Sequence, residues 1–277
     1  LEIRTDLGLG CNVINLLDLV PTKTITRWLP FELAPADLCD LLHNKALHPG
    51  TVPQTREDLL LEQALAREIM RVTVSDMAPR WIPPDSPTHR DLLPSFHLIV
   101  GGGSVLSHAP TFGQAALMLL DALQPVGVFG LALDQEALLA PLGAMALVQP
   151  QAAAQVLEKD GLVNLATVVA PIGSAPEGET ALVCSVRYEE GRILDLEVPF
   201  GAIRVIPLDT GQTAELELRP SPQFDVGLGA SGQAGATTVQ GGTIGVIIDA
   251  RGRPLPFSNA PSKQRERIRR WLAEIKA

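Results

Sequence analysis

The chain has 277 residues, of which 46 % are hydrophobic and 19 % are charged, as in a folded protein rather than a disordered one. Its formal net charge of -9 argues against a nucleic-acid partner, because phosphate binding requires clustered lysine and arginine side chains. No apolar run approaches the roughly 20 residues that cross a bilayer, and the N-terminus lacks a signal-peptide pattern. We therefore expect a cytoplasmic protein without a membrane partner, with two ordinary domains in preference to one large one.

The first 95 residues are expected to form a helical subdomain. Its clearest helix begins after Thr55, because Thr55 and Asp58 have the spacing of a capping box. One apolar face then continues for about five turns. The residues of that face are Leu61, Ala64, Leu65, Glu68, Ile69 and Val72, and shorter helices are expected at 12–19 and 36–42.

Several other segments of this part have both a structural and a functional interpretation. Residues 5–10 could bind phosphate through their glycines, but they lack the Lys-Ser/Thr of a P-loop, which favours a helix-entry turn. Lys45 could touch a ligand, although a solvated lysine beside a turn is the default. Residues 27–31 are expected to anchor packing between elements, and the proline-rich segment 78–95 is expected to form an exposed loop.

The chain is organised around residues 96–104, where an apolar run ends at Gly101, Gly102 and Gly103. This pattern predicts a buried strand, a tight turn and then a helix over 113–123. Because glycine lets a ligand approach the main chain, a nucleotide or other anion could lie there. A plain strand-to-helix turn is the alternative.

A second strand (128–133) and a third helix (136–148) follow. Small residues at Gly143 and Ala144 would let that helix approach a sheet closely. Strand, helix, strand and helix in succession indicate an α/β core over 96–150, whose ligands are expected at the carboxyl ends of the strands.

From residue 162 the hydrophobic period changes from 3.6 to 2, which predicts a small β-sandwich or barrel over 151–260. A helical connector at 149–160 precedes it, a hairpin turn lies at 189–192, and a terminal helix occupies 261–277. The acidic and basic residues at 249–253 could offer Arg251 or Arg253 to an anion, but a charged turn is the favoured interpretation. The predicted strands are 162–169, 180–188, 192–198, 201–206, 212–218, 237–240 and 243–248.

No constellation of catalytic residues or metal ligands is recognisable. Cys11, Cys39 and Cys184 are widely spaced and are expected to be reduced, buried thiols. The five histidines show no metal-ligand spacing, and no Ser/His/Asp arrangement is evident. We therefore assign no catalytic residue and no metal site.

The chain resembles known proteins over residues 4–276. Residues 98–103, 109–125 and 142–146 are similar to the adenosine loop and closing helix of the second half of ASKHA ATPases, which include actin, sugar kinases and large heat-shock chaperones. More narrowly, six segments resemble the MutL-type proteins associated with adenosylcobalamin-dependent glutamate mutase, which are unrelated to mismatch-repair proteins of similar name. These segments are 27–31, 44–45, 61–68, 167–171, 224–227 and 245–254.

This resemblance implies an α/β lobe of the actin-like type with a helical subdomain, followed by the β domain and the terminal helix. It implies an ATP-binding, chaperone-like factor that reactivates a mutase subunit, with Gly101, Gly102, Gly103 and Ser104 on the adenosine loop and ATP or ADP with Mg²⁺ as cofactor. The two Asp-Gly-Thr/Ser phosphate hairpins of the superfamily have no counterpart in this sequence. The chain is thus expected to be a carboxy-terminal portion that hydrolyses no ATP alone.

Two alternatives belong to other functional classes. In the first, the glycines serve packing only, and the β domain of a non-catalytic interaction module contacts a mutase subunit. In the second, the chain is a relative of hydantoinase-like or oxoprolinase-like hydrolases, which the missing catalytic constellation disfavours.

Overall fold

The structure is a computed structural model that describes residues 3–81 and 92–276. The chain divides into two compact units, which we call the helical unit (Leu1–Arg90, Met118–Leu123 and Phe257–Ala273) and the sheet unit (Asp91–Leu117, Gln124–Pro256 and Glu274–Ala277). In the described part of the chain, no helix combines the length and apolar character needed to cross a membrane.

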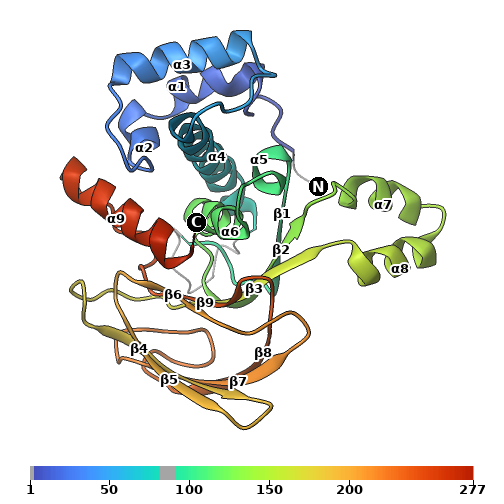
Figure 1. Cartoon of the computed structure of the whole chain (residues 1–277), viewed down its shortest axis with the longest axis vertical. Coiled ribbons are helices and arrows are strands. Elements are labelled where there is room, and N and C mark those ends of the chain that lie inside the picture. Colours follow the sequence, from blue (N-terminus) through green and yellow to red (C-terminus); the bar gives the residue numbers. More distant parts are fainter. Residues whose placement is uncertain (1–2, 82–91, 277) are drawn as a thin grey trace. The chain divides into compact units, whose positions relative to one another are not determined.

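The helical unit confirms the helices expected before residue 78 (Figure 1). Thr55 and Asp58 form the predicted capping box at the start of the long helix α4, with each side chain accepting a hydrogen bond from the other residue's backbone N–H. The elements of this unit are η1 (Cys11–Asn15), α1 (Leu16–Leu19), α2 (Thr22–Thr26), α3 (Pro35–Leu47), α4 (Arg56–Met77), η2 (Ala78–Arg80), the end of α6 (Phe112–Leu123) and nearly all of α9 (Pro261–Glu274).

Polar side chains occupy the interior of the helical unit. On α4, Arg67 donates from Nε to Asp121 Oδ2 at 2.7 Å, and both side chains are buried. The fully buried Glu68 accepts from Trp28 Nε1 at 2.9 Å and from Arg27 at 3.2 Å. Burial lowers the pKa of Arg27, although the Glu68 carboxylate acts in the opposite direction. The expected packing anchor at 27–31 is therefore confirmed, and it includes an ionic contact.

The sheet unit contains two sheets that lie as layers (Figure 1). The first has the order β1-β2-β3-β9-β6 and is mixed, because β1 runs parallel to β2 and β3 runs parallel to β9, while the other two pairs are antiparallel. The second is antiparallel, in the order β5-β4-β7-β8. The strands are β1 (Leu98–Gly102), β2 (Gly127–Asp134), β3 (Val163–Ala170), β4 (Thr180–Tyr188), β5 (Ile193–Pro199), β6 (Ile203–Ile206), β7 (Thr213–Pro220), β8 (Gly235–Gln240) and β9 (Gly245–Asp249).

An apolar core joins the two sheets. Along β4 and β7, buried residues alternate with more exposed ones, which is the period of 2 expected from the sequence. The mixed α/β class is confirmed, whereas the actin-like lobe and the barrel stay predictions. The first sheet takes strands from both sides of residue 150, and the domain limits at 95, 150 and 260 also stay predictions. The core includes Val169, Ile206, Val246 and Ile248 from the first sheet and Leu182, Cys184, Val186, Leu216 and Leu218 from the second.

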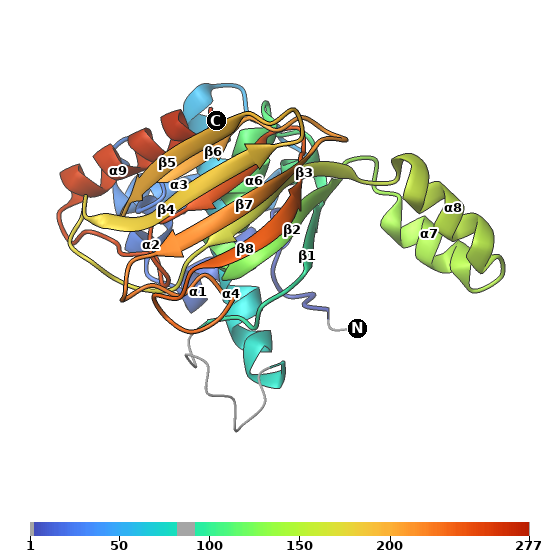
Figure 2. The same cartoon turned by 90° about the horizontal axis from the view of Figure 1, so that it is seen from below.

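The expected packing of the helix at 136–148 on a sheet is wrong. Helix α7 (Leu139–Ala146) has no buried residue, and a Cβ at Gly143 would meet no atom within 4 Å. It packs instead against α8 (Pro150–Asp160), and Figure 2 shows this hairpin extending away from both sheets. The physical reason is topology: β3 lies antiparallel beside β2, so the chain needs no crossover helix between them.

The charged turn expected at 249–253 is buried, because Asp249, Arg251 and Arg253 are all inaccessible to solvent or nearly so. Arg251 Nε donates to Asp249 Oδ1 at 2.8 Å, and Arg253 Nη2 donates to Asp249 Oδ2 at 2.6 Å. Burial by itself would raise the pKa of Asp249, but the two guanidinium groups outweigh it and hold this pKa well below its usual value. Asp249 ends β9, a central strand covered on both edges, which explains why the turn is interior.

Two further expectations have mixed outcomes. Of the three thiols expected to be buried, only Cys184 is; its burial, with Asp195 nearby, raises its pKa to about 11, whereas Cys11 is exposed and Cys39 is partly exposed. The loop expected at 78–95 falls largely on residues 82–91, which lie outside the described residues. At its two ends, Ala78–Arg80 form the 3-10 helix η2, and Leu92 and Leu93 are buried.

Candidate functional sites

The three glycines lie where the sequence places them, at the carboxyl end of β1. Because β1 is parallel to β2, with Gly102 opposite Asp134, the ends of both strands meet at the same edge of the sheet. Gly101 is buried, whereas Gly102, Gly103 and Ser104 are exposed. We call these four residues, together with Asp134, the glycine edge. The structure therefore leaves the main chain of this edge accessible.

Only one of these glycines is demanded by the backbone. Gly103 has φ +98°, a conformation that side chains disfavour, and its carbonyl accepts the first bonds of the short helix α5 (Ser104–Ser107). At Gly102 φ is ordinary, and a Cβ would stand 3.6 Å from the Asp134 Cβ, which is normal van der Waals contact. The fold would therefore accept a side chain at 102, and its absence keeps the backbone open there.

Asp134 is the residue of this edge that sequence reasoning missed. Its carboxylate accepts the backbone N–H groups of Leu138 at 2.7 Å and Leu139 at 3.1 Å, at the entry to α7. Its carbonyl accepts from Ser107 Oγ at 3.3 Å. The signal that could have found it is its place directly after the predicted strand 128–133. Asp134 therefore fixes the turns after both strands.

The other segments singled out in the sequence are separate from this edge. Residues 5–10 precede η1 and are held by Asn12 and Asn15, whose side chains donate to the Thr5 and Asp6 carbonyls. This is the helix-entry turn that the sequence favours. In the described part of the chain, no three His, Cys, Asp or Glu side chains are grouped so that they could hold a metal ion.

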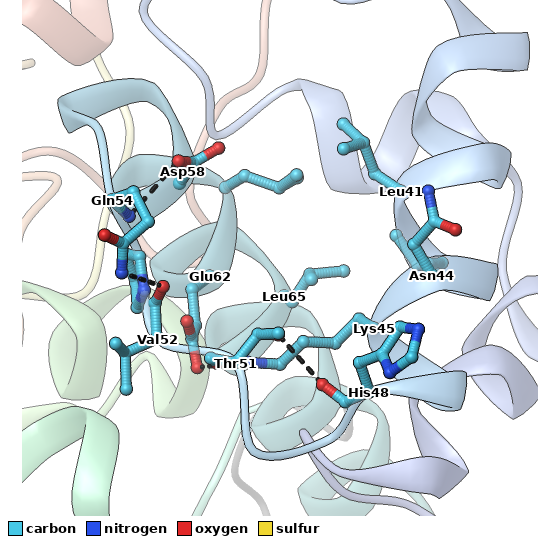
Figure 3. A pocket seen from close by; sticks show the side chains of 13 residues that line it. Leu41, Asn44, Lys45, His48, Thr51, Val52, Gln54, Asp58, Glu62 and Leu65 are labelled. Atoms are coloured by element: carbon cyan, nitrogen blue, oxygen red, sulfur yellow. Dashed lines mark hydrogen bonds and ion pairs between the residues drawn. The ribbon is translucent and has the colours of Figure 1, made fainter.

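A pocket lies within the helical unit, between α3, the first turns of α4 and the loop that joins them (Figure 3). Its volume is about 280 Å³. Lys45 lines it and is not a solvated lysine, because only 15 % of its side chain is exposed. The Lys45 ammonium donates to the Thr51 carbonyl at 2.8 Å and to Glu62 Oε1 at 3.1 Å. Sequence reasoning identified Lys45 but not Glu62 as its partner.

The fold and the glycine edge define a mixed α/β protein with an accessible site at the carboxyl ends of two parallel strands. Residues 2–161, more than half of the 277 residues, match the family model described as MutL protein. The chain therefore belongs to the MutL family, as its resemblance implies. No curated protein and no solved structure matches the chain.

Proposed function

We propose that this chain is the adenosine-binding part of a nucleotide-dependent factor that reactivates an adenosylcobalamin-dependent mutase of the glutamate mutase type. The observation that carries the proposal is the glycine edge, where Gly102, Gly103 and Ser104 are exposed within the segment that matches the MutL family. Family membership supports the mutase partner.

The glycine edge suits the nucleoside better than the phosphates. A flat purine ring can lie against main chain that has no side chain, and Ser104 offers a hydroxyl to it. The described residues do not fit a Mg²⁺-phosphate centre, because no acidic cluster of the required kind occurs among them. ATP would supply a phosphoryl group to such a centre, but we derive no hydrolytic step for this chain.

Calorimetric titration tests whether the chain contacts the nucleoside and not the phosphates. Adenosine, ADP and ATP should bind this chain with affinities within a few-fold of one another, because only the nucleoside is contacted. Gly102→Val should weaken binding at least tenfold, since the new side chain would cover the open backbone, and its Cβ would meet Asp134 only at ordinary van der Waals distance. Gly8→Val is the matched control, because its glycine also has open space and an ordinary φ.

The proposal fails if none of the three compounds gives heat with a folded chain. It also fails if Gly102→Val binds as well as the unmodified protein, because the nucleoside then lies elsewhere.

The α7–α8 hairpin favours a second candidate, a protein-interaction module that acts without nucleotide. Residues 137–157 carry no charge, and Leu147 and Val148 are 88 % and 80 % exposed. Uncharged, exposed apolar side chains are characteristic of the centre of a protein interface.

Pull-down with mutase subunits separates the two candidates. The module predicts capture that does not change on adding ATP and is lost in Leu147→Asp/Val148→Asp. The reactivating factor predicts capture that depends on nucleotide. Gln151→Asp, which adds a charge on α8 without removing an apolar side chain, is the control.

A further inference from the structure

Helices α3 and α4 face each other with residues spaced as in two packed helices, but a pocket lies between them. The pocket is lined by Leu41, Asn44 and Lys45 of α3, by His48, which follows the last residue of α3, and by Asp58, Leu61, Glu62 and Leu65 of α4. Each set follows the i, i+3, i+4, i+7 spacing of one helix face. Such faces normally interdigitate in a helix hairpin, but here they leave about 280 Å³ between them.

The floor of this pocket is apolar. Leu42, Leu61 and Leu65 are buried beneath it, while Leu41 and Val52 are 39 % and 67 % exposed at its mouth. Figure 3 shows Leu41 on one wall and Val52 on the opposite wall, with Leu65 between them. A hydrocarbon group that entered would therefore contact leucine side chains and lose its contact with water.

One wall carries a balanced pair of charges. Only 15 % of the Lys45 side chain and 17 % of the Glu62 side chain are exposed. An ammonium has three N–H donors, and in the part of the chain that the structure describes Lys45 uses two of them, on Thr51 and Glu62. Its third donor is available to a ligand, and the Glu62 carboxylate can accept further hydrogen bonds.

We propose that this pocket binds a free α-amino acid with a branched apolar side chain. The ligand carboxylate accepts from Lys45, the ligand ammonium donates to Glu62, and the side chain lies on the leucine floor. A zwitterion suits this wall because its charges match both members of the pair, whereas an anion alone would face Glu62 and Asp58. The volume lies just below the range of about 300–1,000 Å³ for ligand sites, which favours a small molecule. This binding is independent of the proposed nucleotide site.

L-leucine is the probe, titrated into the full chain by calorimetry. Two analogues separate its charges: 4-methylpentanoate lacks the ammonium, and 3-methylbutylamine lacks the carboxylate. Each should bind at least tenfold more weakly than leucine, a difference of about 1.4 kcal/mol. Glycine keeps both charges but cannot reach the leucine floor, and it should also bind at least tenfold more weakly.

Variants assign the binding to this pocket. Lys45→Met and Glu62→Gln should each weaken leucine binding at least tenfold. Lys23→Met and Glu57→Gln make the same changes at exposed positions outside the pocket, on α2 and α4, and should leave binding unchanged. If a pocket variant does not fold, the site is instead located by amide chemical shifts of the unmodified protein. Added leucine should then change the amide chemical shifts of residues 41–65.

Three results would overturn the proposal. The first is the absence of heat and of shifts with 10 mM leucine, and the second is a set of shifts outside residues 41–65. The third is equal binding of leucine and its two analogues, which would mean that the charge pair recognises nothing.

Discussion

The two units of this protein fill their interiors with different chemistry. Between the two sheets the buried residues are almost all apolar, from Val169 and Ile248 on one side to Leu182 and Leu216 on the other. The buried face of α4, in contrast, includes Gln63, Arg67 and Glu68, and the two charged side chains are held by partners far away in the sequence. The core between the two sheets thus depends on exclusion of water, whereas the core around α4 also depends on pairing of charges. The buried charges of the sheet unit, Asp249, Arg251 and Arg253, are not among the residues of its apolar core.

This difference determines which substitutions each unit tolerates. An apolar core loses free energy in proportion to the area and cavity that a substitution creates. Removing one partner of a buried ion pair costs more free energy, because the remaining charge is left unpaired and without water. The three tryptophans (28, 81 and 271) all belong to the helical unit and the single tyrosine, Tyr188, to the sheet unit, so each unit has its own optical signal.

The largest effect is expected from Glu68→Ala. This change leaves Arg27, Arg71 and the Trp28 indole N–H without their common acceptor, and it should lower the free energy of unfolding by about 3–5 kcal/mol. Urea unfolding followed by tryptophan fluorescence measures it. Glu57→Ala, on the exposed first turn of the same helix, should cost less than about 1 kcal/mol. Equal costs for the two variants would remove the contrast between the interiors.

Leu216→Ala tests the apolar side of the comparison. Leu216 is fully buried on β7, and its truncation should cost about 2–5 kcal/mol, depending on how far the site collapses. The signal of Tyr188 in near-ultraviolet circular dichroism follows the unfolding of this unit. Glu215→Ala, one residue away and paired only at the surface with Arg187, should cost about 0–1 kcal/mol. A cost for Leu216→Ala as small as this control would contradict a close-packed core.

The buried Asp249 makes the sheet unit sensitive to acid. Its pKa is lowered in the folded protein, so its contribution to stability is complete above about pH 3.8, the value for an unperturbed aspartate, and is lost as the pH falls below it. We expect the difference in unfolding free energy between the protein and Asp249→Asn to narrow as the pH falls from 5 to 3. Urea unfolding followed by Tyr188 at each pH measures this difference. If this difference in unfolding free energy stays constant between pH 5 and pH 3, Asp249 has the same pKa in the folded and unfolded states, which would contradict the prediction.

The smallest effect is expected at the start of α4. Thr55→Ala removes the oxygen that accepts the Asp58 N–H and should cost about 1 kcal/mol, measured by urea unfolding with tryptophan fluorescence. Thr55→Ser keeps that oxygen and should change stability by only a few tenths of a kcal/mol. If both variants lose the same amount, the hydroxyl is not the source of the stability.

The sheet unit could be predicted closely because its strands bury alternate apolar residues, a pattern that the sequence displays directly. The predicted strand at 180–188 coincides with β4, for example. The polar interior of the helical unit could be predicted only in part: the periodicity places Glu68 on the apolar face of the helix, but it indicates neither the partners of Glu68 nor the burial of Arg67. Their burial depends on Asp121 and Trp28, which are 54 and 40 residues away.

Prediction of the candidate sites is limited in the same way, by contacts between residues far apart in the sequence. Gly101, Gly102 and Gly103 are found where a strand ends because local sequence determines that end, but the neighbouring Asp134 depends on the pairing of β1 with β2. Likewise, Glu62 becomes the partner of Lys45 only when the fold brings α3 and α4 to the same pocket. The burial of the charged residues at 249–253 could not be predicted, because the sequence does not show that β9 lies between two other strands.

The antiparallel pairing of β2 with β3 has a practical consequence. Leu133 lies opposite Val163, so the segment that contains α7 and α8 leaves the sheet and returns to it at neighbouring points. A short reverse turn could therefore bridge this gap, and the hairpin could be excised or exchanged for another peptide while the strands keep their register. In evolutionary terms, such a segment can be exchanged as one unit while the two strands that flank it stay paired.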